Sequence, residues 1–583
     1  MGRFEEIQKV LNEVSPVPVN LPKLYLLGDT GAGKTTIIRK ILGTEENKFP
    51  TTRQTRTTVA PTEYVIREGN DYDITVILKP LSEIEGYIDE IIREAIARFQ
   101  KDNDKNKITK NLRQTSDQRF RLYYLLPQEY IDRISQKIID LSPLVEQKVE
   151  EYKNDFPEDK EETGIFVEFA LNELGEDYKS ICNDVIAEIQ RKVESVCDGE
   201  KLGSSWKIYK YSDSNKDSFL AKSKEILSSE SNSISPLIEY ARVRGNLKAP
   251  WVSPNTEAVI IDGEGIGHNT KETGQLSSRH YDYFYIADAI LLIEESKKPF
   301  VAGGKNALKS ICERGYKDKL LVLFTKLDEV EPYDIDDPTN DDRREEVQDA
   351  LTNVLASLKE DGVDIDLSEN TIYYLGGMKE KGLGEDAIEQ LNSVLAWSRK
   401  LSKFEGSFVR PNYDFEMLSA FLVESTKKFN DLYQQMLEKQ HWKTIEAFSR
   451  RMYLGIDGFR MFTPIADFEE KINDEIKKFI AKPISWSQEV SNQLKEQSLD
   501  SIRREFNKLI IEYARTEIIS LPHDNWDRAY MYTGIGSTFK RRNDIKAILQ
   551  SSVPPFVASI DTKKFKDRIK SMLEKAIANC EKV

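Results

Sequence analysis

The strongest constraint on the fold is an eight-residue segment, Gly28-Asp29-Thr30-Gly31-Ala32-Gly33-Lys34-Thr35, which matches the pattern G-x-x-x-x-G-K-[ST] in full. An apolar run at 24–28 precedes it, and a helical pattern that begins at Thr36 follows it. This order predicts a strand, a loop whose backbone N–H groups turn inward around phosphate oxygens, and a helix. Lys34 would place a cation on the β- and γ-phosphates, and the Thr35 hydroxyl would reach Mg²⁺.

Further apolar runs with the length of buried strands follow the motif, at 258–262, 289–293, 320–324 and 371–375. Most are followed by a loop and a helical pattern, as at 307–314 and 385–398. Such alternation predicts an α/β domain with a mostly parallel sheet and helices on both faces. A further β pattern, at 63–67 and 72–78, is interrupted by Gly69-Asn70-Asp71 and predicts a hairpin.

Two long regions carry apolar residues at helical spacing instead. Between about 80 and 255 the strand signals nearly vanish, and after about 402 one seam keeps a 3-4-3-4 rhythm from Leu499 to Tyr513. Because the sheet pattern resumes at Ala258, the first region is predicted to be a helical insertion. The expected organisation is an N-terminal helix (1–20), an α/β domain in two parts (21–80 and 256–401), a large all-helical insertion (81–255) and a C-terminal helical domain (402–583).

Charge and composition exclude several classes of protein. The 583 residues include 84 Lys and Arg against 99 Asp and Glu, and the net charge of −15 opposes non-specific binding of nucleic acid. The four scattered cysteines predict reduced thiols rather than a disulfide framework. The apolar runs are too short to span a bilayer, and the first residues lack an apolar signal core, so we expect a cytoplasmic protein.

The choice of nucleobase depends on Thr325-Lys326-Leu327-Asp328, which directly follows the predicted strand 320–324. A carboxylate at Asp328 would accept hydrogen bonds from the guanine N1–H and exocyclic amine, a pair of donors that adenine lacks. Lys326 would lie along the base and brace the phosphate loop. We therefore expect GTP and GDP as ligands; an ATPase in which this tetrapeptide is accidental remains the alternative.

Two further segments are candidates for sensing the γ-phosphate. Asp262-Gly263-Glu264-Gly265 fits D-x-x-G at the end of a predicted strand, where Asp262 would hold Mg²⁺ through water and the Gly265 N–H would follow the γ-phosphate. Upstream, Thr57 and Thr58 lie between the helix that follows the phosphate loop and the next β pattern. Either could bind Mg²⁺, and the sequence does not choose between them.

Together these motifs resemble those of translation-factor-class P-loop GTPases, and the T-K-L-D and A-G-K wording resembles the dynamin-like branch. The resemblance covers about 21–80 and 256–400. It implies Mg²⁺-dependent GTP hydrolysis that involves Lys34, Thr57, Thr58 and Gly265, and a nucleotide state coupled to helical-domain movement or self-assembly. It also implies a homo-oligomer, such as a dimer through the GTPase domains, or a protein partner.

Some residues depart from the pattern of this family. Ras-like relatives carry a Gln directly after D-x-x-G, but this chain has Ile266, which implies that water is positioned by another residue, a partner or a second G domain. Residues 376–379 are only a loose counterpart of the last guanine-contacting loop. No lipid-inserting tip is evident, so membrane fission is not implied. A nucleotide-gated interaction protein with little hydrolysis remains a second hypothesis.

Two other features have an ordinary interpretation and a sharper one. His268 is expected to be a switch-loop residue without a catalytic role, and action near the γ-phosphate is the alternative. We expect a helix break with a basic flank at Gly534 to Ser537, which is followed by Lys540, Arg541 and Arg542. An arginine finger that acts across a dimer is the alternative there.

Overall fold

The computed structural model describes the chain except for residues 1–2, 46–47, 51–59, 114–119, 121, 156–162, 229–232, 267–275, 334, 362, 364, 366, 380–381, 402–406, 535, 558 and 583. The chain forms two compact units. The first contains residues 1–37 and 250–583, and the second contains residues 38–249.

A parallel sheet lies at the centre of the first unit, with strands in the order β6-β1-β7-β8-β9. Nearly every residue in these strands is buried, as expected when helices cover both faces. The strands coincide closely with the apolar runs found in the sequence, and their bounds are β1 (Lys23–Gly28), β6 (Ala258–Asp262), β7 (Ala289–Glu295), β8 (Leu320–Thr325) and β9 (Ile372–Tyr374).

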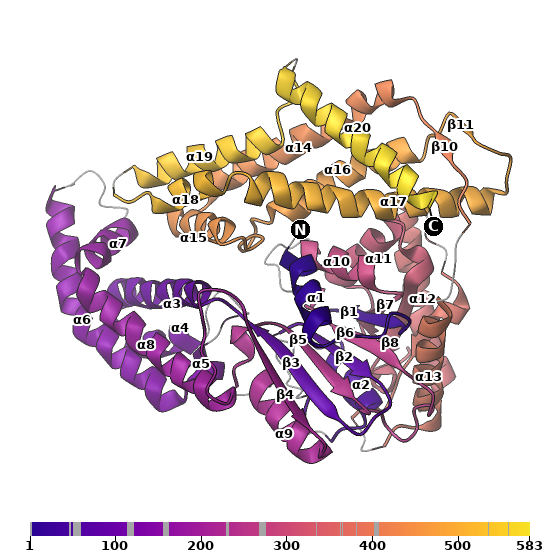
Figure 1. Ribbon diagram of the computed structural model, residues 1–583, viewed down its shortest axis with the longest axis horizontal. Coiled ribbons are helices and arrows are strands. Elements are labelled where there is room, and N and C mark those ends of the chain that lie inside the picture. The colour runs from indigo at the N-terminus through magenta and orange to yellow at the C-terminus, as the bar shows by residue number, and fades with distance from the viewer. Residues whose placement is uncertain are drawn as a thin grey trace. The chain divides into compact units, whose positions relative to one another are not determined.

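Helices pack against this sheet. Contacts join α10 and α13 to β1, α11 to β7, and α13 to β9 (Figure 1). The predicted α/β class with a mostly parallel sheet is therefore confirmed. The bounds of the helices are α1 (Arg3–Val14), α2 (Lys34–Leu42), α10 (Ser278–Ile286), α11 (Ala302–Glu313), α12 (Asn340–Glu360) and α13 (Glu385–Leu401).

The C-terminal part of the first unit is helical, as predicted. Helices α14, α16, α17 and α20 pack alongside one another (Figure 1), and the seam from Leu499 to Leu509 is buried in α17. A π-helical segment, η8 (Arg515–Ser520), follows α17, and β10 (Pro411–Asn412) pairs with β11 (Ser485–Trp486). The helices are α14 (Leu418–Lys439), α15 (Trp442–Tyr453), α16 (Pro464–Ile480), α17 (Asn492–Ala514), α18 (His523–Met531), α19 (Ser537–Ser552) and α20 (Ile560–Cys580).

The second unit combines strands in the order β4-β3-β5-β2 with a group of helices. The strands are β2 (Thr62–Ile66), β3 (Tyr72–Leu78), β4 (Lys207–Asp213) and β5 (Ile238–Gly245). The helices are α3 (Leu81–Asp102), α4 (Lys105–Arg113), α5 (Leu122–Leu125), α6 (Gln128–Asp155), α7 (Thr163–Glu173), α8 (Gly175–Val196) and α9 (Lys216–Leu227). The helical part of the insertion thus runs mainly from α3 to α8.

Two expectations for the second unit are wrong. The segments 63–67 and 72–78 form strands, but they are not a hairpin, because β5 lies between them, parallel to β2 and antiparallel to β3. The insertion 81–255 was also expected to be all-helical, but it contains strands β4 and β5, in a region where the sequence shows almost no strand signal. The sequence of β5 explains why this strand was missed. Its Arg242 and Arg244 are buried and form ion pairs with Glu63 and Asp73. Charged residues that are neutralised by partners on other strands hide the apolar pattern of a strand.

The described part of the chain bears on two other expectations from composition. None of its helices combines the length and apolarity that crossing a bilayer requires. The four cysteines are free thiols, as predicted.

Candidate nucleotide-binding site

The predicted phosphate loop connects the end of β1 to the start of α2. Gly31 and Gly33 have φ values of +92° and +103°, a left-handed conformation that glycine adopts without the steric strain of a side chain. The Lys34 ammonium donates hydrogen bonds of 2.7 Å and 3.0 Å to the carbonyls of Gly28 and Asp29. Lys34 and Thr35 are buried at the base of the loop, whereas Thr30 and Gly31 are exposed. The loop therefore has an open face above a lysine that is already in place.

The charge of Lys34 is balanced by nearby carboxylates. Burial lowers the pKa of the Lys34 ammonium, and the negative charge of Asp262 opposes that effect. Burial also raises the pKa of Asp29. Bound phosphates would add negative charge beside Lys34. Because negative charge nearby stabilises the protonated ammonium, a triphosphate would favour the cationic form of Lys34.

The T-K-L-D segment contacts the phosphate loop directly. The Thr325 hydroxyl, at the end of β8, donates a hydrogen bond of 2.8 Å to the Ala32 carbonyl. Lys326 has a left-handed backbone conformation and forms an ion pair of 2.5 Å with Glu295. The structure thus brings together two motifs whose contacting residues are 293 positions apart in the sequence.

Asp328 lies beside the loop that follows β9. Its Oδ1 atom accepts a hydrogen bond of 2.8 Å from the Gly377 N–H, and its side chain is exposed. The backbone N–H of Leu327 donates to the Leu375 carbonyl at 3.0 Å, which fixes the two loops against each other. The loose counterpart of the last guanine loop is therefore adjacent to the residue predicted to select guanine.

The D-G-E-G segment begins where β6 ends. Asp262 is buried and pairs in register with Leu26 of β1, which places it next to the start of the phosphate loop. Gly263 packs so closely that a Cβ atom there would lie 2.7 Å from Cε2 of Tyr25 and 3.0 Å from Cε2 of Tyr283. No other residue type would allow the turn to follow this path without moving an aromatic ring.

Ile266 is buried, and its aliphatic side chain offers no polar group to a water molecule. A Cβ atom added to Gly303, at the start of α11, would lie 3.1 Å from Cγ2 of Ile266. That this position does not orient water, in contrast to a glutamine, stays a prediction.

Sequence reasoning missed Glu294 and Glu295, which end β7 beside the phosphate loop. Glu294 is buried, its Oε2 accepts a hydrogen bond of 2.9 Å from the Phe300 N–H, and burial raises its pKa to about 8. Glu295 pairs with Lys326, as described above. The available signal was two adjacent carboxylates at the carboxyl end of a buried parallel strand, an edge where α/β proteins place ligands.

Some predicted residues lie outside the described residues. These are Thr57, Thr58 and His268. Gly265 is described and buried, and Thr36 continues α2 directly after Thr35. The assignments of Thr57, Thr58 and Gly265 to γ-phosphate chemistry stay predictions.

The arginine-finger alternative is contradicted for Arg541. Its buried guanidinium donates hydrogen bonds of 2.8 Å, 3.3 Å and 2.6 Å to the carbonyls of Ala529, Tyr530 and Tyr532. Arg542 donates to the Gln440 carbonyl at 2.9 Å. Arg541 thus holds the turn between α18 and α19, in agreement with the expected helix break.

The arrangement of these elements decides the fold class. A phosphate loop joins β1 to α2, an aspartate ends the neighbouring strand β6, and T-K-L-D ends β8, which lies two strands from β1. The α/β domain has the fold of a P-loop GTPase. In this domain, all these motifs lie at the carboxyl ends of parallel strands, where such sheets bind ligands.

Comparison with known proteins gives a limited result. No protein-family model and no curated protein matches the sequence. Two solved chains of an oligomerised bacterial dynamin pair, described as a mechanism for long-range sensing and tethering of membranes, are similar at 13% and 12% identity with TM-scores of 0.27 and 0.30. Each comparison covers 99% of this chain and 75% of the other. At such values the site residues themselves, rather than this likeness, carry the functional conclusion.

Proposed function

We propose that the P-loop domain binds GTP and hydrolyses it to GDP. The observation that carries the proposal is that T-K-L-D contacts both the phosphate loop and the loop that follows β9. Thr325 binds the phosphate loop through Ala32, and Asp328 lies beside the backbone of Gly377. A cradle for a triphosphate and a carboxylate for a purine base are therefore held in one structural unit.

Asp328 is the residue that selects the base in this proposal. Its exposed carboxylate would accept hydrogen bonds from the N1–H and the exocyclic amine of guanine. Adenine presents no such pair of donors and would leave the carboxylate without compensation for its lost water. The Gly377 N–H, which contacts the same carboxylate, would fix its orientation.

Lys34, Thr35 and Asp262 fit a magnesium-bound triphosphate. They are buried around the base of the loop and supply one cation, one hydroxyl and one carboxylate. Among the described residues no group of three or more His, Cys, Asp or Glu side chains could hold a metal ion. Thr35 and Asp262, with Thr57 or Thr58, would hold Mg²⁺ together with phosphate oxygens, and Mg²⁺ would neutralise charge on the transferring phosphoryl group.

The attacking water requires an orienting group that Ile266 does not supply. This residue is buried and apolar at the position where a water-orienting glutamine is found in related GTPases. We propose that a second copy of the chain, bound through the GTPase domain, or another protein partner completes the site. In this dynamin-like scheme, hydrolysis is slow in a monomer, and the helical domain follows the nucleotide state.

The buried Ile266 also favours a second candidate function. A chain that binds GTP and hardly hydrolyses it could act as a nucleotide-gated switch that holds a protein partner through its helices. Single-turnover hydrolysis at increasing protein concentration separates the two functions. A rate per molecule that rises with concentration supports the GTPase proposal, and binding with no hydrolysis at any concentration favours the switch.

The base assignment is tested with Asp328→Asn. The carboxamide can donate to the C2 carbonyl of xanthine and accept from its N1–H, so this variant should lose guanine nucleotides and gain xanthosine nucleotides. Affinities for GDP, ADP and xanthosine diphosphate are measured for both proteins. If the wild type prefers ADP, or if the variant keeps its guanine preference, the assignment is wrong.

A further inference from the structure

Among the described residues of the first unit, ion pairs join the α/β domain to the C-terminal helices in two different places. Three of them meet the last residue of α11 or the segment that connects α11 to β8. Arg314 forms a buried bidentate pair with Glu469 of α16, at 2.5 Å and 2.7 Å. The other two are Lys477 with Glu313 at 2.6 Å, and Arg504 with Asp318 at 2.6 Å and 2.7 Å. We call these three pairs the anchor.

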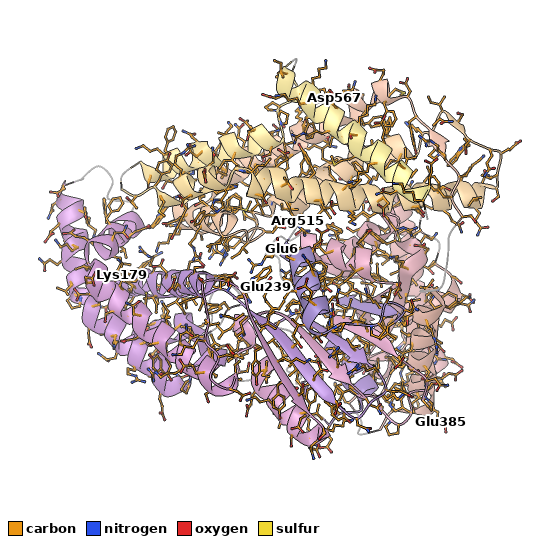
Figure 2. All side chains as sticks on the ribbon, in the orientation of Figure 1. Glu6, Lys179, Glu239, Glu385, Arg515 and Asp567 are labelled. Atoms are coloured by element: carbon orange, nitrogen blue, oxygen red, sulfur yellow. The ribbon has the colours of Figure 1, made fainter. Side chains whose placement is uncertain are left out.

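A fourth ion pair meets α10 instead. Arg515, labelled in Figure 2, donates hydrogen bonds of 2.8 Å and 2.7 Å to the two oxygens of Asp282. It also lies 3.4 Å from the Ser278 hydroxyl, which in turn donates to Asp457 in the turn after α15. We call the Arg515–Asp282 pair the clamp. Its position is distinctive because α10 is the first α-helix after D-G-E-G among the residues that the structure describes.

The clamp is a strong contact because it is removed from water. Both side chains are largely buried, and two parallel hydrogen bonds match the planar guanidinium to the carboxylate. Burial alone would lower the pKa of Arg515, but the charge of Asp282 raises it above its ordinary value. Separation of the pair would leave two poorly solvated charges, so the clamp has a definite closed arrangement.

The next residue of α10, Tyr283, contacts the strand that leads into the phosphate loop. Tyr283 stacks on Tyr25 of β1 with ring centroids 4.8 Å apart, and Phe4 of α1 meets its edge at 5.4 Å. The same two tyrosines confine Gly263. A displacement of the D-G-E-G turn therefore acts on α10 through Tyr283, and α10 presents the neighbouring residue, Asp282, to the clamp.

Arg515 also begins a segment that is suited to transmit such a displacement. In η8 the Leu521 N–H bonds to the Thr516 carbonyl at 2.9 Å, five residues back, and π-helical turns are frequent at functional sites. The segment is tied to its neighbours by Trp526, whose indole N–H donates to the Ile518 carbonyl at 2.6 Å, and by Ser552, whose hydroxyl donates to the Glu517 carbonyl at 2.6 Å. Movement at Arg515 thus reaches α18 and α19.

We propose that the Arg515–Asp282 clamp couples the nucleotide site to the C-terminal helices by holding α10 and the D-G-E-G turn in the position seen here. This inference rests on the proposed function. A turn that follows the γ-phosphate pulls on α10 and strains the clamp, while the anchor keeps the rest of the interface fixed. Because coupling between two sites is reciprocal, a weakened clamp raises affinity for GTP relative to GDP.

The test compares two matched substitutions in the full-length protein. Asp282→Asn removes the carboxylate of the clamp, and Asp318→Asn makes the same chemical change in the anchor. Dissociation constants for GDP and a non-hydrolysable GTP analogue are measured by calorimetry. We expect Asp282→Asn to shift the ratio of the two constants at least about fivefold toward the GTP analogue. Asp318→Asn should change the ratio less than about twofold.

A second measurement follows the helices themselves. Amide hydrogen exchange of residues 515–521 should differ between the GDP and GTP-analogue complexes in the wild type and in Asp318→Asn. This difference should disappear in Asp282→Asn. Arg515→Lys, which keeps the charge but loses the bidentate geometry, should shift the affinity ratio in the same direction by a smaller factor, and it replaces Asp282→Asn if that variant does not fold.

The outcomes distinguish the two proposals. If the wild type binds neither guanine nucleotide, the proposed function fails and the clamp fails with it. If the wild type binds both nucleotides but the affinity ratio is unchanged in Asp282→Asn, only the clamp is wrong. Equal shifts in Asp282→Asn and Asp318→Asn would also overturn it, because the coupling would then belong to the whole interface.

Discussion

The hydroxyl of Thr325 donates a hydrogen bond of 2.8 Å to the carbonyl of Ala32, and this contact connects the T-K-L-D segment to the phosphate loop. Both partners are buried. A Cβ atom added to Gly33 would lie 3.5 Å from the methyl group of Thr325. The Thr325 side chain therefore both hydrogen-bonds to the loop and packs against it.

Replacement of Thr325 by valine should therefore weaken nucleotide binding. The variant keeps the shape of the side chain but removes the hydroxyl donor, and we expect affinity for GDP to fall about tenfold, the value of one hydrogen bond. Thr325→Ser keeps the hydroxyl and should stay within about threefold of the wild type. Titration calorimetry measures both. Equal losses in the two variants would show that packing of the methyl group matters and the hydrogen bond does not.

Gly263→Ala should impair the D-G-E-G turn. The new Cβ would lie 2.7 Å from the ring of Tyr25, which is fully buried and cannot move aside. We expect a loss of stability of about 1–3 kcal/mol and a larger loss of Mg²⁺-dependent hydrolysis. Gly175→Ala is the matched control, because a Cβ there meets nothing within 4 Å. Thermal unfolding and hydrolysis assays of the two variants decide, and a fully active Gly263→Ala protein would contradict the packing argument.

Glu294 should make stability depend on pH. Burial raises its pKa from the ordinary value of 4.5 to about 8, so the folded chain keeps this proton at pH values where the unfolded chain has released it. This contribution to stability is complete below about pH 4.5 and is lost progressively as the pH rises to about 8. In Glu294→Gln the side chain is neutral at every pH and can still accept from the Phe300 N–H.

The variant should therefore gain stability relative to the wild type as the pH rises. Urea unfolding at pH 5, 6.5 and 8 measures the difference, which should grow by at most about 1.4 kcal/mol per pH unit. A difference that is independent of pH would show that Glu294 is ionised in the folded protein throughout this range.

Arg314→Ala should be strongly destabilising because it leaves the fully buried Glu469 without its cation. Asn473 also donates to Glu469, at 2.6 Å, but it supplies no charge. We expect a loss of about 3–5 kcal/mol in the free energy of unfolding. The double variant Arg314→Met with Glu469→Leu should lose much less, since it removes both charges. A double variant that is less stable than Arg314→Ala would contradict this explanation.

The positions of the candidate site's segments at strand ends could be predicted from sequence because each segment is local. The phosphate loop, D-G-E-G and T-K-L-D are each short segments at the end of an apolar run, and the structure places each at the end of a strand. Their local backbone and side-chain chemistry is specified within a few residues. The register that brings Asp262 beside Leu26 follows from adjacent parallel strands.

The incorrect expectations concern contacts between distant residues. The apparent hairpin at 63–78 failed because β5, more than 150 residues further along the chain, lies between its two strands. Its Arg242 and Arg244 have no apolar signal, and their burial depends on Glu63 and Asp73 on the neighbouring strands. An analysis of the apolar pattern in each segment separately does not detect ion pairs between distant segments.

The sequence by itself determined the chemistry of the site, because each motif consists of a few residues whose geometry is set by their immediate neighbours. The tertiary structure alone decided which strand separates β2 from β3, which backbone group meets Asp328, and which arginine meets α10. Those contacts join residues far apart in the chain, and only the packing of whole elements against one another selects them. The fold therefore brings the motifs into contact, and the motifs supply the side chains of the proposed site.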